Sequence, residues 1–242
     1  SLILTFFPKF KSLFFEKLES LFRIEDLKVN ELIESKRKKL LDPLKNLKSR
    51  DAKLKQQNAV RILEFGIGCG SNLAHYPPNT RLVAVDTNPL FEEQLLTILK
   101  KHENVTLEKF LVTCASNLSE IDDESVDAIV CTHTFCCVDD QLAVAKELKR
   151  ILVQGGKFYF FEHVGYRWRC GFRGQKEKLY RILQCLVRPL WRVWFNNCRL
   201  GYRPRPILLK AGFADVSTEY FECKEQHFII RPNVIGIATR LL

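Results

Sequence analysis

The sequence contains no methionine, not even at position 1. Ser1 is therefore not expected to be the start of translation, and we expect further sequence upstream of it. None of the nine cysteines forms a C-x-x-C pair, and no zinc-finger spacing is present. No metal is therefore expected, and a reduced protein that faces the cytosol accounts for the odd number of thiols most simply.

A long apolar run is missing from the first thirty residues. The longest stretch without a charge there is Ser1–Pro8, which is far short of the roughly 18 to 20 residues that a membrane-spanning helix needs. Apolar residues instead recur every three or four positions from Phe6 to Phe22. This pattern predicts an amphipathic helix, which either packs on the following domain or lies in the plane of a membrane.

Acidic residues are nearly absent from the segment between Val164 and Arg205. Glu177 is its one acid beside eleven Lys and Arg residues, so this segment carries the whole net charge of +10. All three tryptophans of the chain also lie there. Such a composition is typical of a membrane-interface surface, of single-stranded nucleic-acid binding, or of solvated helices whose arginines cover apolar surface.

Short apolar runs alternate with amphipathic stretches from residue 59 onward. We expect strands at 60–65, 81–86, 105–110, 127–131, 157–161, 213–221 and 233–240, and helices at 91–101, 142–152 and 207–211. Strands alternating with helices predict an α/β fold with a doubly wound, mostly parallel sheet of seven strands. Residues 1–58 are assigned to the amino-terminal helix and a linker, and 59–242 to one domain with an insertion at 164–206.

A glycine loop follows the first of these strands directly. It reads Gly66-x-Gly68-x-Gly70, and Glu64 stands two residues before it. Glycines at such a turn let backbone N–H groups approach a ligand at the carboxyl edge of a parallel sheet. Asp86 ends the next strand, where a carboxylate can accept hydrogen bonds from both ribose hydroxyls. The alternatives are a tight turn without a ligand and a nicotinamide enzyme, which usually carries G-x-G-x-x-G.

The tighter glycine spacing after an acid resembles motif I of class I S-adenosylmethionine-dependent methyltransferases. The resemblance implies a Rossmann-like sheet with the loop along the methionine part of the cofactor. Asn117, followed by Leu118, stands where these enzymes carry an acid for the adenine amino group, and its side-chain carbonyl can accept that hydrogen bond. Thr132 is expected at the floor of the site.

Several short motifs are similar to those of the membrane-associated methyltransferase-like thiol S-methyltransferases. They are Glu34-Ser35-Lys36-Arg37, Tyr76-Pro77-Pro78, Asp86-x-Asn88-Pro89, Val130-Cys131-Thr132 and Phe161-Glu162-His163. Trp191 and Cys198 also fit the spacing of that family, although a buried structural cysteine is the simpler interpretation of Cys198. The resemblance implies a small lipophilic thiol as acceptor, and a location on the cytosolic face of the endoplasmic reticulum or of lipid droplets.

Methyl transfer from a sulfonium is an in-line displacement, so the enzyme mainly orients the acceptor and excludes water. A thiol acceptor must also lose its proton. His163 and His133 each follow a strand at the expected mouth of the site and are the candidate bases, unless they merely bond to loop backbone. Two other functions stay open: O- or N-methylation of RNA or another small molecule, and a lipid-surface binding module without turnover. Nucleic acid is not the expected partner.

Overall fold

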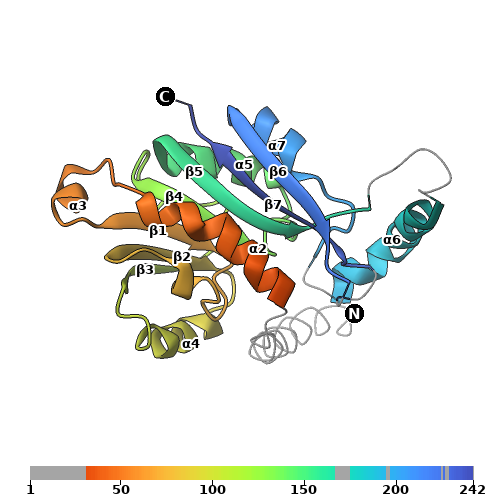
Figure 1. Ribbon diagram of the computed structural model, residues 1–242, viewed down its shortest axis with the longest axis horizontal. Coiled ribbons are helices and arrows are strands. Elements are labelled where there is room, and N and C mark those ends of the chain that lie inside the picture. Colours follow the sequence, from red (N-terminus) through yellow and green to blue (C-terminus); the bar gives the residue numbers. More distant parts are fainter. Residues whose placement is uncertain (1–30, 167–174, 195–196, 225, 227–228, 242) are drawn as a thin grey trace, which may run out of the picture.

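A seven-stranded sheet forms the centre of the computed structural model (Figure 1). The structure describes residues 31–166, 175–194, 197–224, 226 and 229–241. The amphipathic helix expected between Phe6 and Phe22 lies outside them. The strands are β1 (Val60–Phe65), β2 (Thr80–Asp86), β3 (Val105–Val112), β4 (Val126–Thr132), β5 (Leu152–His163), β6 (Asp215–Glu222) and β7 (Pro232–Thr239).

The strand order is β3-β2-β1-β4-β5-β7-β6. Neighbours among β1 to β5 run parallel, whereas β7 is antiparallel to both β5 and β6. The expected doubly wound, mostly parallel sheet is therefore confirmed. From β1 the chain adds β2 and β3 on one side, and from β4 it adds β5 on the other, so the strand order changes direction between β1 and β4. Open sheets of this kind bind ligands outside the carboxyl ends of the strands at such a point.

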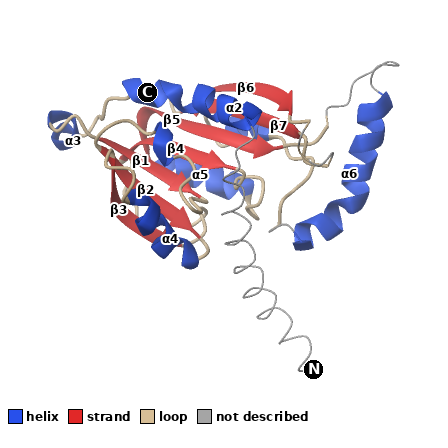
Figure 2. Cartoon of the chain, turned by 60° about the horizontal axis from the view of Figure 1, so that its bottom comes forward, coloured by secondary structure: helices blue, strands red, loops and turns tan. Residues whose placement is uncertain are grey.

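Helices cover both faces of this sheet (Figures 1 and 2). They are α2 (Glu31–Leu41), α3 (Ala52–Gln56), α4 (Leu90–Leu99), α5 (Gln141–Ile151), α6 (Gln175–Trp194) and α7 (Pro204–Lys210), with 3-10 turns η1 (Asp42–Asn46) and η2 (Leu73–His75). Because both faces are covered, all seven residues of β4 are buried, which explains why this strand is an unbroken apolar run apart from Asp127 and Thr132. Among the described residues, no helix is both long and apolar enough to cross a membrane.

Residues 31–58 pack on the sheet, although the sequence suggested a solvated helix and linker. Helix α2 contacts β5 and β7, and Leu40, Leu41 and Leu44 are buried in the core. The polar stretch that follows is held by Asp127, whose carboxylate accepts hydrogen bonds from the Ser49 hydroxyl at 3.0 Å and from two backbone N–H groups. A buried carboxylate in the sheet therefore fixes a segment whose composition looks solvated.

Helix α6 stands beside the sheet near β6 and β7 (Figure 2). The side chain of Gln184, fully buried, connects it to the domain. Its Oε1 accepts the backbone N–H of Tyr166 at 3.0 Å, and its Nε2 donates to the carbonyl of Ile229 at 2.6 Å. The side of α6 that faces the domain is thus joined to it through a polar residue.

Gly236 leaves no room for a side chain in β7. A Cβ at this position would lie 2.3 Å from Cζ of Phe160 and 2.6 Å from the carbonyl oxygen of Ser217. Because backbone of a neighbouring strand cannot move away easily, we expect Gly236→Ala to lower the free energy of unfolding by about 1–3 kcal/mol. Urea unfolding measures this, with the exposed position Ser217→Ala as a control that should stay within about 0.5 kcal/mol of wild type. An unchanged Gly236→Ala protein would contradict this packing of β7.

Candidate functional site

Asp86 joins the glycine loop to the segment after β2. It is 8% exposed; one carboxylate oxygen accepts the N–H of Gly68 and the other that of Asn88, both at 3.0 Å. Gly66 has φ of +66°, and a Cβ there would lie 2.0 Å from Oγ1 of Thr134. The glycine loop therefore meets the loop after β4, at the point where the strand order reverses.

A cavity of about 60 Å³ opens at this meeting of loops. Its lining includes Gly66 and Asp86, Thr113 and Cys114 after β3, and Thr134 after β4. Ligand pockets commonly measure about 300–1,000 Å³. A cofactor of nucleoside size therefore extends beyond this cavity or displaces side chains that line it, Thr134 being the one closest to the loop. The glycine at position 66 and the carboxylate of Asp86 fit such a ligand.

Of the eight expected cofactor residues, Gly66 and Asp86 line this cavity, whereas Glu64, Gly68, Gly70, Asn117, Leu118 and Thr132 lie outside its lining. Asn117 is exposed, three residues beyond Cys114, and its backbone N–H donates to the Cys114 carbonyl at 2.9 Å. Leu118 is fully buried, and Thr132 is 7% exposed beneath the loop. Cys114 lines the cavity and Asn117 does not, so the adenine contact of Asn117 stays a prediction.

Glu64 is buried beneath the glycine loop. One of its oxygens accepts from Nδ2 of Asn72 at 2.6 Å and the other from the hydroxyl of Tyr76. The same amide nitrogen of Asn72 lies 3.1 Å from Oγ1 of Thr132, so it connects β1 to β4. Burial raises the pKa of Glu64 to about 7. These contacts make Glu64 a positioning residue for the loop, and Asn72 is a member of the site that the motif search missed.

Glu162 plays the corresponding part at the end of β5. It is fully buried, and its oxygens accept the N–H groups of Thr134 at 3.3 Å and of Phe135 and Cys136 at 3.0 Å. Burial raises the pKa of this carboxyl. Alternation along the strand separates it from His163, so Glu162 fixes the loop after β4 while His163 faces elsewhere.

The two candidate bases lie against each other. The rings of His133 and His163 stack with centroids 4.1 Å apart and planes at 10°. Nε2 of His133 is 3.3 Å from Oδ1 of Asn233, whereas Nε2 of His163 is buried and has no hydrogen-bond partner within the described part of the chain. The structure thus brings the pair together, and their role as bases stays a prediction.

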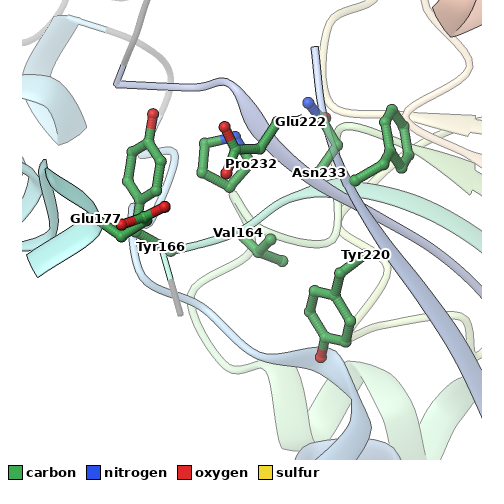
Figure 3. A pocket seen from close by; sticks show the side chains of 9 residues that line it. Val164, Tyr166, Glu177, Tyr220, Glu222, Pro232 and Asn233 are labelled. Atoms are coloured by element: carbon green, nitrogen blue, oxygen red, sulfur yellow. The ribbon is translucent and has the colours of Figure 1, made fainter. Parts of the chain in front are cut away.

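A second cavity, of about 230 Å³, begins one residue beyond His163 (Figure 3). Val164, Tyr166, Tyr220 and Pro232 give it apolar and aromatic walls, and Asn233 lines it as well. Asn233 also contacts His133, and His133 directly precedes Thr134, which lines the first cavity. The histidine pair therefore lies next to lining residues of both cavities. Glu177 of α6 and Glu222 of β6 line it with carboxylates.

The raised pKa of Glu64 makes a prediction about stability. The folded state keeps the proton up to about pH 7, whereas the ordinary pKa is 4.5. The contribution of Glu64 to stability is therefore fully present below pH 4.5 and is lost as the pH rises to about 7. The Glu64→Gln variant has no titrating group at this position. Between pH 4.5 and 8 we therefore expect its free energy of unfolding to fall less than that of wild type, and the difference should be on the order of 2–3 kcal/mol.

Chemical denaturation at several pH values measures this difference. Glu103→Gln, at an exposed position, is the matched control and should follow the wild-type curve. Parallel curves for wild type and Glu64→Gln would contradict a protonated, buried Glu64.

Residues 63–160 match a family model described as a methyltransferase domain. The chain is 30% identical to thiol S-methyltransferase TMT1B of Rattus norvegicus over 208 residues, which are 86% of this chain and 80% of that protein. It is 29% identical to thiol S-methyltransferase TMT1A of Homo sapiens over 211 residues, 87% of this chain and 81% of that one.

Solved structures agree in fold. The YcgJ protein of Bacillus subtilis superposes with a TM-score of 0.60 at 14% identity, over 86% of this chain and 99% of that one. Phosphoethanolamine N-methyltransferase 2 of Haemonchus contortus, in complex with S-adenosyl-L-methionine, gives 0.59 at 13% identity over 86% of this chain and 53% of that one. The glycine loop and Asp86 lie at the carboxyl ends of β1 and β2, next to the point where the strand order changes direction. The chain belongs to the thiol S-methyltransferase family within the class I methyltransferases, and S-adenosylmethionine is its cofactor.

Proposed function

We propose that this enzyme methylates small lipophilic thiols at a membrane surface. The observation that carries the acceptor class is the second cavity, because its volume of about 230 Å³ suits a small molecule and the side chains of Val164, Tyr166, Tyr220 and Pro232 form apolar and aromatic parts of its walls. The names of the relatives, thiol S-methyltransferases TMT1A and TMT1B, support a thiol in particular.

The residues of this chain would divide the work between the two cavities. S-adenosylmethionine supplies an electrophilic methyl group when bound. Asp86 and the glycine loop would hold the cofactor, beside the loop that Glu162 fixes. Val164, Tyr166 and Tyr220 bind the acceptor and keep water out, so that the acceptor is held in one orientation within the site.

The exposed face of α6 supports action at a membrane. Leu179, Ile182 and Leu186 are 54%, 50% and 70% exposed, and their spacing of three and four places them on one side of the helix. The opposite side carries Gln184 and Tyr180 toward the domain. The helix thus contacts the domain on one side and still exposes three large apolar side chains on the other, which a helix that only covers a soluble core does not need.

Charge identifies the kind of surface that this helix fits. Lys176, Arg188 and Arg192 of α6 are exposed, and Glu177 is the only acid in the helix. Apolar side chains bordered by cations suit an anionic lipid surface, where the leucines enter the interface and the cations meet the headgroups. A location on the cytosolic face of the endoplasmic reticulum or of lipid droplets is part of the proposal. The free thiols at all eight cysteines of the described residues are consistent with such a reducing compartment.

Methylation of RNA has less support from the same segment. Trp191 is half-buried against the core, and the ring of Tyr180 lies 5.2 Å from that of Tyr166. These two rings therefore pack against the domain and are not displayed for stacking with bases.

The acceptor class can be tested with methyl-labelled S-adenosylmethionine and alkyl thiols of increasing length beside the matching alcohols. We expect turnover of thiols, and Asp86→Asn should lower kcat/KM at least about tenfold because an amide cannot accept from two donors with both of its atoms. Asp122→Asn, at an exposed acid, is the control. Methylation of alcohols or RNA with no methylated thiol would overturn the acceptor class, and full activity of Asp86→Asn would overturn the cofactor site.

The membrane surface can be tested by sedimentation with vesicles of phosphatidylcholine with and without phosphatidylserine. Replacing Leu179, Ile182 and Leu186 together by glutamine should weaken binding at least about tenfold. Full burial of one side chain of this size contributes about 1.5–3 kcal/mol, so partial insertion of three is enough for an effect of this size. Leu96→Gln on α4, 48% exposed, is the matched control. Binding that is equally strong in both variants would contradict docking through α6.

A further inference from the structure

Two cysteines and a histidine from distant parts of the chain meet beside the histidine pair. Cys136 lies in the loop after β4, His163 ends β5, and Cys198 follows α6. The Sγ atoms of Cys136 and Cys198 are 3.7 Å apart, and one donor atom from each of the three residues lies within 4.8 Å of the other two. Cys136 is 0% and Cys198 6% exposed.

One polar atom of His163 is left unsatisfied beside this cluster. Nε2 of His163 is buried and has no hydrogen-bond partner in the part of the chain that the structure describes. A buried polar atom without a partner costs free energy, typically about 1–3 kcal/mol. The thiols can offer each other only weak hydrogen bonds. A ligand with affinity for sulfur and imidazole would satisfy all three groups.

We propose that Cys136, His163 and Cys198 form a binding site for a soft metal ion, Zn²⁺ or Cu⁺. Thiolates and imidazole are the donors that these ions prefer. With metal–sulfur bonds of about 2.3 Å, two sulfurs of a tetrahedral site lie about 3.8 Å apart, and the observed Sγ separation of 3.7 Å is close to that value.

The surrounding loop positions one of the two sulfurs. The thiolate is the form that binds metal, so both thiols lose their protons when an ion binds. Glu162 accepts the backbone N–H of Cys136 at 3.0 Å and so holds one ligand in place, as supporting contacts around metal ligands commonly do.

The inference reaches beyond the proposed function and does not depend on it. An ion at this position would join the segment after α6 to the ends of β4 and β5, and thereby hold α6 on the domain. It would also bind the imidazole of His163, which is one of the two candidate bases. The expectation of no metal rested on the lack of close cysteine spacing, which a site built from three segments does not need.

The test uses the full chain without a histidine tag, purified with a non-thiol reductant and stripped by a chelator. Titration with Zn²⁺ against a chromogenic chelator should give one ion per chain. At a hundredfold excess over Kd, the melting temperature should rise by at least about 4 °C. Cd²⁺ should add ultraviolet absorption from thiolate-to-metal charge transfer.

Cys136→Ser, Cys198→Ser and His163→Asn should each weaken Zn²⁺ binding at least about 100-fold. Cys185→Ser, at an exposed cysteine of α6, should bind as wild type does. Retained affinity in both cluster cysteine variants, or loss in Cys185→Ser, would overturn the site.

X-ray absorption on the unmodified, zinc-loaded chain covers the case in which a variant fails to fold. Two sulfur ligands at about 2.3 Å and a nitrogen at about 2.0–2.1 Å are expected. A shell of oxygen and nitrogen alone, or no bound ion after titration, would overturn the proposal. Thiol methylation is not read in any of these measurements, so their failure is distinguishable from failure of the proposed function.

Discussion

Buried carboxylates at the carboxyl ends of the central strands are the constraint on which the site depends. A carboxylate removed from water is tolerated only when donors surround it. Glu64 takes donors from Asn72 and Tyr76, Asp86 from the loops after β1 and β2, and Glu162 from three successive N–H groups. Each acid therefore fixes a loop, and the two cavities take their shape from loops held in this way.

Much of the sheet could be predicted because buried strands must be apolar on both faces. The strand expected at 127–131 is observed at Val126–Thr132, but the one expected at 157–161 extends over Leu152–His163. Gly155, with φ of +72°, lies where the pairing of β4 with β5 shifts in register, and its N–H donates to the carbonyl of Arg240. That contact comes from the residue that follows β7, far away in sequence, and local composition carries no signal for it. The packing of residues 31–58 escaped prediction for the same reason.

The parts of the site that follow one another in the chain were the predictable ones. Asp86 and the glycine loop are adjacent to strand ends, so spacing alone located them. The stacking of His133 on His163, the role of Glu162 and the meeting of Cys136 with Cys198 depend on how β4, β5 and α6 are placed in space. No pattern within a window of sequence encodes these contacts, although the end of a strand was a correct guide to where such residues gather.

The antiparallel strand β7 separates β5 from β6, and β6 pairs with no other strand in the described sheet. As the chain emerges from the ribosome, β6 therefore has no place to bind until β7, which follows it, has been made and inserted. Tyr220 of β6 and Asn233 of β7 both line the second cavity. Formation of the second cavity therefore depends on the pairing of β5 with β7, two strands far apart in the chain, and such long-range pairing is slow to form.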